Sequence, residues 1–125
     1  MRDFRYPKTW LILGWSGIGL LVWFSLASLT LHIDVEYGDK WMHLLTYALL
    51  MGWFVQLYSR WPLILLHALL LMLLGVMLEF LQTQTGRHFE VADMLANTLG
   101  VTLGGITVLT PLRDRLLWLE RKLFV

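Results

Sequence analysis

The chain contains no cysteine, only three prolines among its 125 residues, and few charged residues. The absence of cysteine excludes both a disulfide framework and a thiol nucleophile. Charged residues make up 15% of the chain and hydrophobic residues 58%, and the mean hydropathy is +0.64. This balance lies outside the usual range for a soluble domain of this length. The sequence therefore predicts an integral membrane protein.

The hydrophobic residues are gathered in four stretches, each long enough to cross a hydrocarbon core of about 30 Å as a helix of roughly 20 residues. The stretches cover residues 10–31, 40–58, 61–82 and 92–110. The first is too long for the apolar core of a secretory signal, which spans roughly 7–15 residues, and no small-residue cleavage site follows it. We therefore predict an all-α fold with four transmembrane helices in one domain, residues 1–111, followed by a separate tail, residues 112–125.

The positive charges predict the orientation of these helices. Eight of the ten Lys and Arg residues lie at the N-terminus, in the second connection or at the C-terminus: Arg2, Arg5, Lys8, Arg60, Arg113, Arg115, Arg121 and Lys122. Only Lys40 and Arg87 fall in the first and third connections. Because positively charged residues remain on the cytoplasmic side, both termini should be cytoplasmic and the first and third connections should face outward. The net charge of +1 thus reflects topology, and nothing in the sequence supports nucleic-acid binding.

The tail after Pro111 has the pattern of a short amphipathic helix. Its leucines recur at helical spacing between basic residues: Leu112, Leu116, Leu119 and Leu123. Such a helix is expected to lie on the anionic cytoplasmic leaflet, and a partner-binding helix is the alternative. Tryptophans near the ends of the predicted helices are typical of the aromatic belt at a membrane interface: Trp10, Trp41, Trp61 and Trp118.

Polar side chains recur near the predicted outer ends of three helices. Asp39, His43 and Tyr47 share one stripe of the second helix, because residues four apart point within about 40° of each other. Asp93 and Asn97 likewise share one face of the fourth helix. The other polar candidates are Lys40, Glu79, Gln82 and Arg87. Polar groups in hydrocarbon are costly unless they are paired or hydrated, so this convergence predicts a functional site.

Small residues indicate how the helices approach one another. Ala96, Gly100 and Gly104 form a ridge on the fourth helix, and Gly75 lies one turn before Glu79 on the third. Such ridges allow close contact between membrane helices. We expect close packing to bring Glu79 towards the polar face of the fourth helix.

The order and spacing of the polar residues and glycines form one extended pattern: Asp39-Lys40-x-x-His43-x-x-x-Tyr47, Glu79-x-x-Gln82, Gly86-Arg87 and Asp93-x-x-x-Asn97-x-x-Gly100-x-x-x-Gly104. Over roughly residues 10–111 it resembles the signature of VanZ-like membrane proteins, a family named for an accessory protein of glycopeptide antibiotic resistance. The resemblance implies a four-helix protein of the bacterial inner membrane. VanZ-like proteins have been grouped with membrane enzymes thought to process lipid headgroups or lipid-linked envelope precursors. Thr85 stands where the family often has proline. This difference should change the stiffness of the third connection more than its chemistry.

An enzymatic interpretation gives these residues roles in hydrolysis or transfer at an ester or phosphoester of a membrane amphiphile. His43 would be the general acid or base, because its unperturbed pKa near 6.5 suits proton transfer at neutral pH. Asp39 or Asp93 would orient its ring, and Glu79 would be a second acid or base. Arg87 would grip a phosphate with its planar guanidinium. The other substrate-binding candidates are Lys40, Tyr47, Gln82 and Asn97.

Non-enzymatic interpretations remain open at this point. The opposite charges could form a near-neutral network that only holds helices together. The protein could also be an accessory that binds an envelope lipid without chemistry. A metal site could use His43, Glu79 and Asp93, with Asp39 or His88 as a further ligand, but their spacing matches no established ligand pattern. We therefore predict no metal and no cofactor, and expect membrane lipids or a lipid-linked substrate as the partners.

Overall fold

The computed structural model describes residues 2–27, 38–83 and 91–124 of the chain, and these residues form helices and short connections with no β-strand. The elements are α1 (Pro7–Ala27), α2 (Gly38–Leu57), α3 (Trp61–Thr83), α4 (Val91–Ile106), the 3₁₀ turns η1 (Thr107–Leu109) and η2 (Pro111–Asp114), and α5 (Arg115–Leu123). The predicted all-α class is confirmed. The predicted fourth helix, residues 92–110, is α-helical only to Ile106 and tightens into η1 beyond it.

The prolines lie where helices tolerate them. Pro7 is the first residue of α1, Pro62 is the second residue of α3, and Pro111 opens η2. In the first turn of a helix the backbone N–H groups have no acceptor within the helix, so the N–H that proline lacks is not missed there, and the fixed φ of proline suits that position. Pro111 therefore separates α4 and η1 from the tail, and the Thr110 hydroxyl caps the new turn by accepting from the Leu112 N–H.

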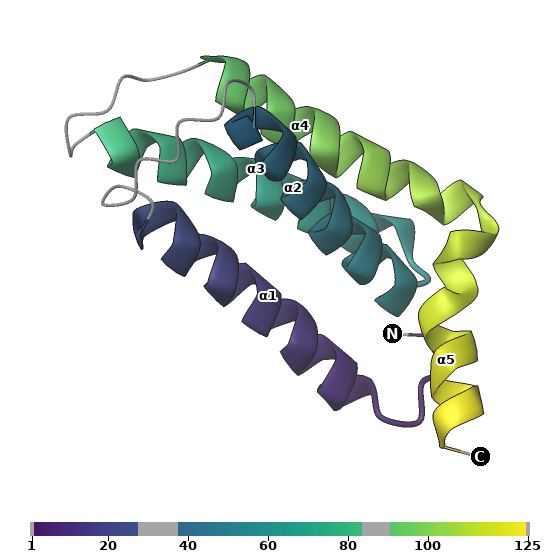
Figure 1. The fold of residues 1–125 in the computed structure, drawn as a ribbon. Helices are drawn as coiled ribbons and strands as arrows, with labels where there is room; N and C mark the ends of the chain where they lie inside the picture. The colour runs from purple at the N-terminus through teal and green to yellow at the C-terminus, as the bar shows by residue number, and fades with distance from the viewer. Residues whose placement is uncertain (1, 28–37, 84–90, 125) are drawn as a thin grey trace.

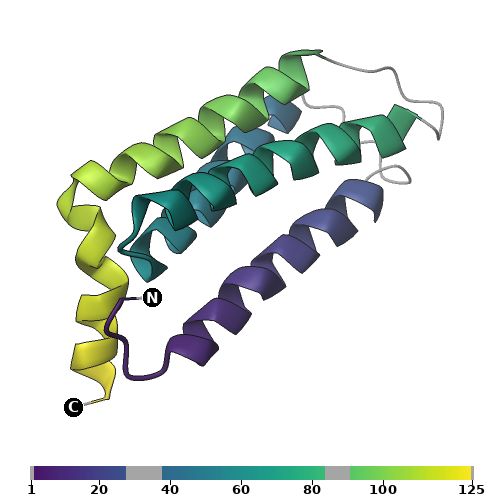
Figure 2. The same ribbon diagram turned by 180° about the vertical axis from the view of Figure 1, so that it is seen from behind.

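The long helices lie side by side and α5 runs across one end of them (Figures 1 and 2). The chain ends, the connection between α2 and α3, and α5 all lie at this end, which we call the terminal end. The last turns of α1 and α3 and the first turns of α2 and α4 lie at the opposite end, which we call the far end. Of all helix pairs, α2 and α4 have the most extensive contact.

Two segments are long and apolar enough to cross a membrane, Trp61–Leu81 and Val91–Leu109. A third segment, Trp41–Leu57, is a shorter apolar helix. Many large apolar side chains on the long helices face outward, and on α1 these include Leu20, Trp23 and Phe24, each more than half exposed. An exposed apolar surface of this extent is typical of a site that contacts a membrane or another protein.

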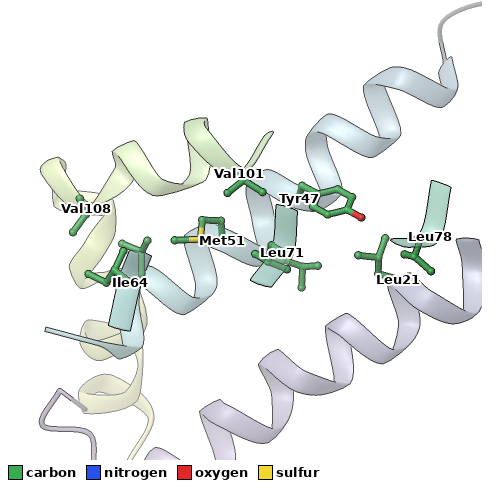
Figure 3. Close-up of a cluster of buried hydrophobic side chains, with 10 residues drawn as sticks. Leu21, Tyr47, Met51, Ile64, Leu71, Leu78, Val101 and Val108 are labelled. Carbon is green, nitrogen blue, oxygen red and sulfur yellow. The ribbon is translucent and has the colours of Figure 1, made fainter. Parts of the chain in front are cut away.

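Two apolar clusters hold the helices together. The larger one runs along α2 and includes Tyr47, Met51 and Val55 of that helix, with Leu71 of α3 and Val101 of α4 (Figure 3). The smaller one lies at the terminal end and contains Phe4, Trp10, Phe54, Leu57 and Leu116. The first cluster packs the long helices, and the second attaches the N-terminal segment and α5 to them.

The glycine ridge of α4 packs directly on the backbone of α2. A Cβ on Gly100 would collide with the Leu44 carbonyl oxygen, and a Cβ on Gly104 would lie 2.5 Å from the Ala48 carbonyl oxygen. The prediction of close helix approach is confirmed, but the partner is α2, whereas we expected the ridge to draw α4 towards α3. Close approach of α4 to α3 involves Gly75 instead, as described below.

Candidate functional site

Four polar side chains are buried together near the far end, and we call them the polar cluster: Tyr47, Glu79, Asp93 and Asn97. They come from α2, α3 and α4, and their exposed fractions are 1%, 4%, 1% and 4%. In Figure 3 the Tyr47 hydroxyl points towards the part of the core where Leu21 and Leu78 lie. Three helices thus bury acidic, amide and phenolic groups within adjacent turns of an otherwise apolar bundle.

Gly75 makes room for this cluster. A Cβ on Gly75 would lie 2.9 Å from Asn97 Nδ2 and 3.2 Å from the Tyr47 hydroxyl oxygen. The side chains from α2 and α4 therefore converge over the bare backbone of α3, one turn before Glu79. Asn97 Oδ1 is buried and has no hydrogen-bond partner within the described part of the chain. A buried acceptor of this kind is rare in folded proteins, and it can receive a hydroxyl or amide N–H from a ligand.

His43 lies one helical turn closer to the far end than Tyr47, and Asp93 lies one turn closer than Asn97. His43 is partly exposed, whereas Asp93 is buried. By helix geometry the two residues stand above the point where Tyr47 and Asn97 meet. The far end therefore presents a partly exposed imidazole one helical turn from the buried polar cluster.

The remaining predicted site residues are only partly described. Asp39 and Lys40 lie in the first turn of α2, and Gln82 lies in the last turn of α3, but their side chains are outside the described set. Arg87 is outside the described residues altogether. Among the described residues, no three His, Asp or Glu side chains come close enough together to hold a metal ion. The described residues therefore show no metal site built from His43, Glu79 and Asp93, and the other two candidate ligands, Asp39 and His88, lie outside the described side chains.

A second polar region, at the terminal end, was not predicted. The Glu120 carboxylate of α5 is 2% exposed and accepts three hydrogen bonds. The donors are the Arg5 N–H at 2.5 Å, the Tyr6 N–H at 3.1 Å and the Trp10 indole N–H at 2.5 Å. Burial by itself would raise the pKa of Glu120, but these hydrogen bonds and the Arg5 charge lower it below its ordinary value. Glu120 therefore holds the start of α1 as a buried anion.

Further contacts extend this attachment, and together with the Glu120 contacts we call them the terminal clamp. The Arg2 guanidinium forms an ion pair with Asp114 and donates to the Arg113 carbonyl oxygen at 2.8 Å. Arg113 in turn donates to the Tyr58 carbonyl oxygen at 3.2 Å, and Gln56 Oε1 accepts from the Leu116 N–H at 2.7 Å. The terminal clamp thus joins the N-terminal segment, the end of α2, η2 and α5.

Two interpretations of terminal residues need correction. Trp10 is 8% exposed within the smaller apolar cluster, so it is not an interfacial anchor. Leu116 is buried in the same cluster, so the leucines of the tail do not all face one side, whereas Leu112, Leu119 and Leu123 are exposed as expected. The contact between Glu120 and the N-terminal segment spans more than 110 residues, and no local pattern in the sequence signals it.

Comparison with known proteins adds no relative: no family model, no curated protein and no solved structure matches the chain.

Proposed function

We propose that the protein is a multi-pass protein of the bacterial inner membrane, with α1 to α4 as four spans and both termini in the cytoplasm. Support comes from the two candidate spans, the apolar α2, and the outward-facing Leu20, Trp23 and Phe24 of α1. The eight basic residues of the chain ends and second connection belong to the terminal end, as the positive-inside rule requires of a cytoplasmic side. The far end then faces outward.

We further propose a VanZ-like function, in which the far end binds the headgroup of a lipid or lipid-linked envelope precursor and hydrolyses or transfers it. One observation supports this above all: the polar cluster is buried at 4% exposure or less, and helix geometry places the partly exposed His43 one turn closer to the far end than Tyr47. Buried ionisable groups within membrane helices are expensive and generally serve function. A link to glycopeptide resistance follows from the same resemblance.

The proposed chemistry uses His43 as the general base that takes a proton from an attacking hydroxyl, while Asp93 orients its ring. Asn97 and Tyr47 hold the polar headgroup through hydrogen bonds, with Asn97 Oδ1 as the open acceptor. Arg87 grips a phosphate, and Glu79 supplies a second acid or base. The acyl or prenyl chains of the substrate remain in the bilayer beside α2 and α4.

The alternative is a non-enzymatic envelope accessory whose polar cluster only holds helices together. The observation that favours it is the depth of burial, because Tyr47 and Asp93 are each 1% exposed and the glycines pack tightly beside them. In a low dielectric such a network locks helix register when every member is satisfied. The two functions differ in what they demand of His43, because only the enzyme needs its imidazole to transfer a proton.

The test compares His43→Gln with His67→Gln as a matched control. His67 lies near the terminal end, 9% exposed, with its Nδ1 2.7 Å from the Leu63 carbonyl oxygen and its ring beside Phe54 and Tyr58. We expect His43→Gln to keep the melting temperature in detergent and to make a specific lipid or lipid-linked precursor accumulate in membranes. His67→Gln should leave the lipid profile unchanged.

If His43→Gln stays folded and alters no lipid, while Asp93→Asn unfolds the bundle, the accessory function is correct and the enzyme proposal is wrong. A reporter fused after Arg60 tests the membrane orientation separately. A periplasmic signal from that fusion would reverse the orientation and place the polar cluster on the cytoplasmic side.

A further inference from the structure

A groove of about 460 Å³ lies on the opposite half of the bundle from the polar cluster, where α2, α4 and the tail meet. Leu49 and Gly52 of α2 form one side, Leu103 of α4 forms the other, and Leu112 and Arg115 close the terminal end. Its volume is in the range of small-molecule sites. Leu49, Leu103 and Leu112 are 65%, 45% and 52% exposed, so the groove is open along its length.

The polar side chains of Trp53, Gln56 and Thr107, which line the groove, already form hydrogen bonds within the protein. The Trp53 indole donates to the Trp10 carbonyl oxygen at 3.0 Å. Gln56 donates to the Gly52 carbonyl oxygen at 3.2 Å and accepts from the Leu116 N–H at 2.7 Å. The Thr107 hydroxyl donates to the Gly104 carbonyl oxygen at 2.5 Å. The walls therefore offer a ligand almost only hydrocarbon.

Arg115 is the exception. It is exposed, it lines the groove, and no described residue forms a side-chain hydrogen bond or ion pair with it. The nearby acidic residues are already engaged, Asp114 by Arg2 and Glu120 by the N-terminal segment. One uncommitted guanidinium at the mouth of an apolar groove matches an amphiphile with a negatively charged head.

We propose that this groove binds one anionic phospholipid of the leaflet at the terminal end, with an acyl chain along Leu49 and Leu103 and the phosphate on Arg115. This site is distinct from the polar cluster and takes a different ligand for a different purpose. The bound lipid covers the seam between α2, α4 and the tail, and so fastens the terminal clamp to the membrane. The proposal rests on the membrane embedding proposed above and not on any chemistry at His43.

The experiment is native mass spectrometry of the detergent-purified chain with added dioleoylphosphatidylglycerol or, as the neutral probe, dioleoylphosphatidylcholine. We expect one tightly held phosphatidylglycerol and weaker binding of phosphatidylcholine. Arg115→Gln should weaken phosphatidylglycerol binding about fivefold, the factor expected for one basic residue near an anionic surface. Arg121→Gln, an exposed change on α5 away from the groove lining, should leave it unchanged.

A second pair of variants tests the apolar part of the site. A Cβ on Gly52 meets only Thr107 Oγ1, at 3.9 Å, so Gly52→Leu fills the groove without a backbone clash. Gly105→Leu, where a Cβ has nothing within 4 Å, is the matched control. We expect Gly52→Leu to abolish the binding of both lipids. Gly105→Leu should bind both lipids as the unmodified chain does. If Gly52→Leu lowers the melting temperature, Leu49→Gln serves in its place.

If Arg115→Gln and Arg121→Gln weaken phosphatidylglycerol binding equally, the lipid is held by diffuse charge attraction and the proposal is wrong. The proposal is also wrong if Gly52→Leu still binds lipid, or if the chain forms a dimer that excludes lipid from the groove. Membrane fractionation distinguishes this failure from failure of the proposed function. A chain found outside the membrane fraction refutes the embedding itself, whereas a membrane-bound chain without selective lipid refutes only this site.

Discussion

The polar cluster and the terminal clamp both bury carboxylates, but different groups surround them. In the terminal clamp, two backbone N–H groups just before α1 and the Trp10 indole in its first turn donate to Glu120. In the polar cluster, side chains from three helices converge, and the acceptor Asn97 Oδ1 has no partner within the described residues. The three donors to Glu120 already have their acceptor within the protein, whereas the Asn97 acceptor is open to a hydrogen-bond donor from a ligand. The comparison therefore supports a structural role for the terminal clamp and a binding role for the polar cluster.

The largest expected effect is at the glycine contact beside the polar cluster. Gly100→Leu forces a side chain into the Leu44 carbonyl of α2, and a helix backbone yields less readily than a flexible side chain. We expect a loss of about 3 kcal/mol in the free energy of unfolding, at the upper end of ordinary overpacking. Thermal unfolding in detergent measures it, with Gly19→Leu as the control, because a Cβ at Gly19 has nothing within 4 Å. Equal melting temperatures for the two variants would contradict the close α2–α4 contact.

The far end was the more predictable of the two regions. Residues four apart share a helix face, so Asp93 with Asn97 and His43 with Tyr47 could be aligned from spacing alone. Gly100 and Gly104, four residues apart on α4, likewise indicated a close contact with another helix. Spacing along one helix does not reveal which neighbour a face contacts, so the sequence did not show that Gly100 packs on α2.

The terminal end was largely unpredictable. Glu120 lies among basic residues in an amphipathic pattern, so it was not distinguished from a solvated charge. Trp10 has the position of an interfacial tryptophan, and only its distant partner shows that it is buried. The positive-inside rule predicts both chain ends on one side of a membrane, but it carries no information on whether they touch. Contacts between residues more than 100 positions apart depend on tertiary packing that neither periodicity nor charge counts encode.

Removal of the Glu120 carboxylate tests the terminal clamp and should have the next largest effect. Glu120→Ala leaves the buried Trp10 indole N–H and the part-buried N–H groups of Arg5 and Tyr6 without an acceptor, which costs about 2 kcal/mol of local stability. We expect faster hydrogen exchange in residues 2–10 and 115–123 and unchanged exchange in α3 and α4. Asp114→Asn is the control, since it removes an ion pair with one exposed partner, and such pairs contribute about 1 kcal/mol or less. Equal exchange in the two variants would show that Glu120 does not hold the terminal clamp.

The smallest expected effect is the response of the terminal clamp to acid. The pKa of Glu120 is lowered from 4.5 in the folded state, because the hydrogen bonds and the Arg5 charge outweigh its desolvation. A carboxyl with a depressed folded pKa contributes its stability above the unfolded value and loses it as the pH falls through the folded value. Docking of α5 should therefore be constant above about pH 4.5 and weaken below it.

The chain has no cysteine, so a nitroxide attached to Leu123→Cys reports the mobility of α5 by electron paramagnetic resonance without competing labelling sites. Because Asp114 beside Arg2 also titrates in acid, the measurement uses the Asp114→Asn background with and without Glu120→Gln. Label mobility should rise with acid only while Glu120 is present; the same rise in the Glu120→Gln chain would assign the response to another group.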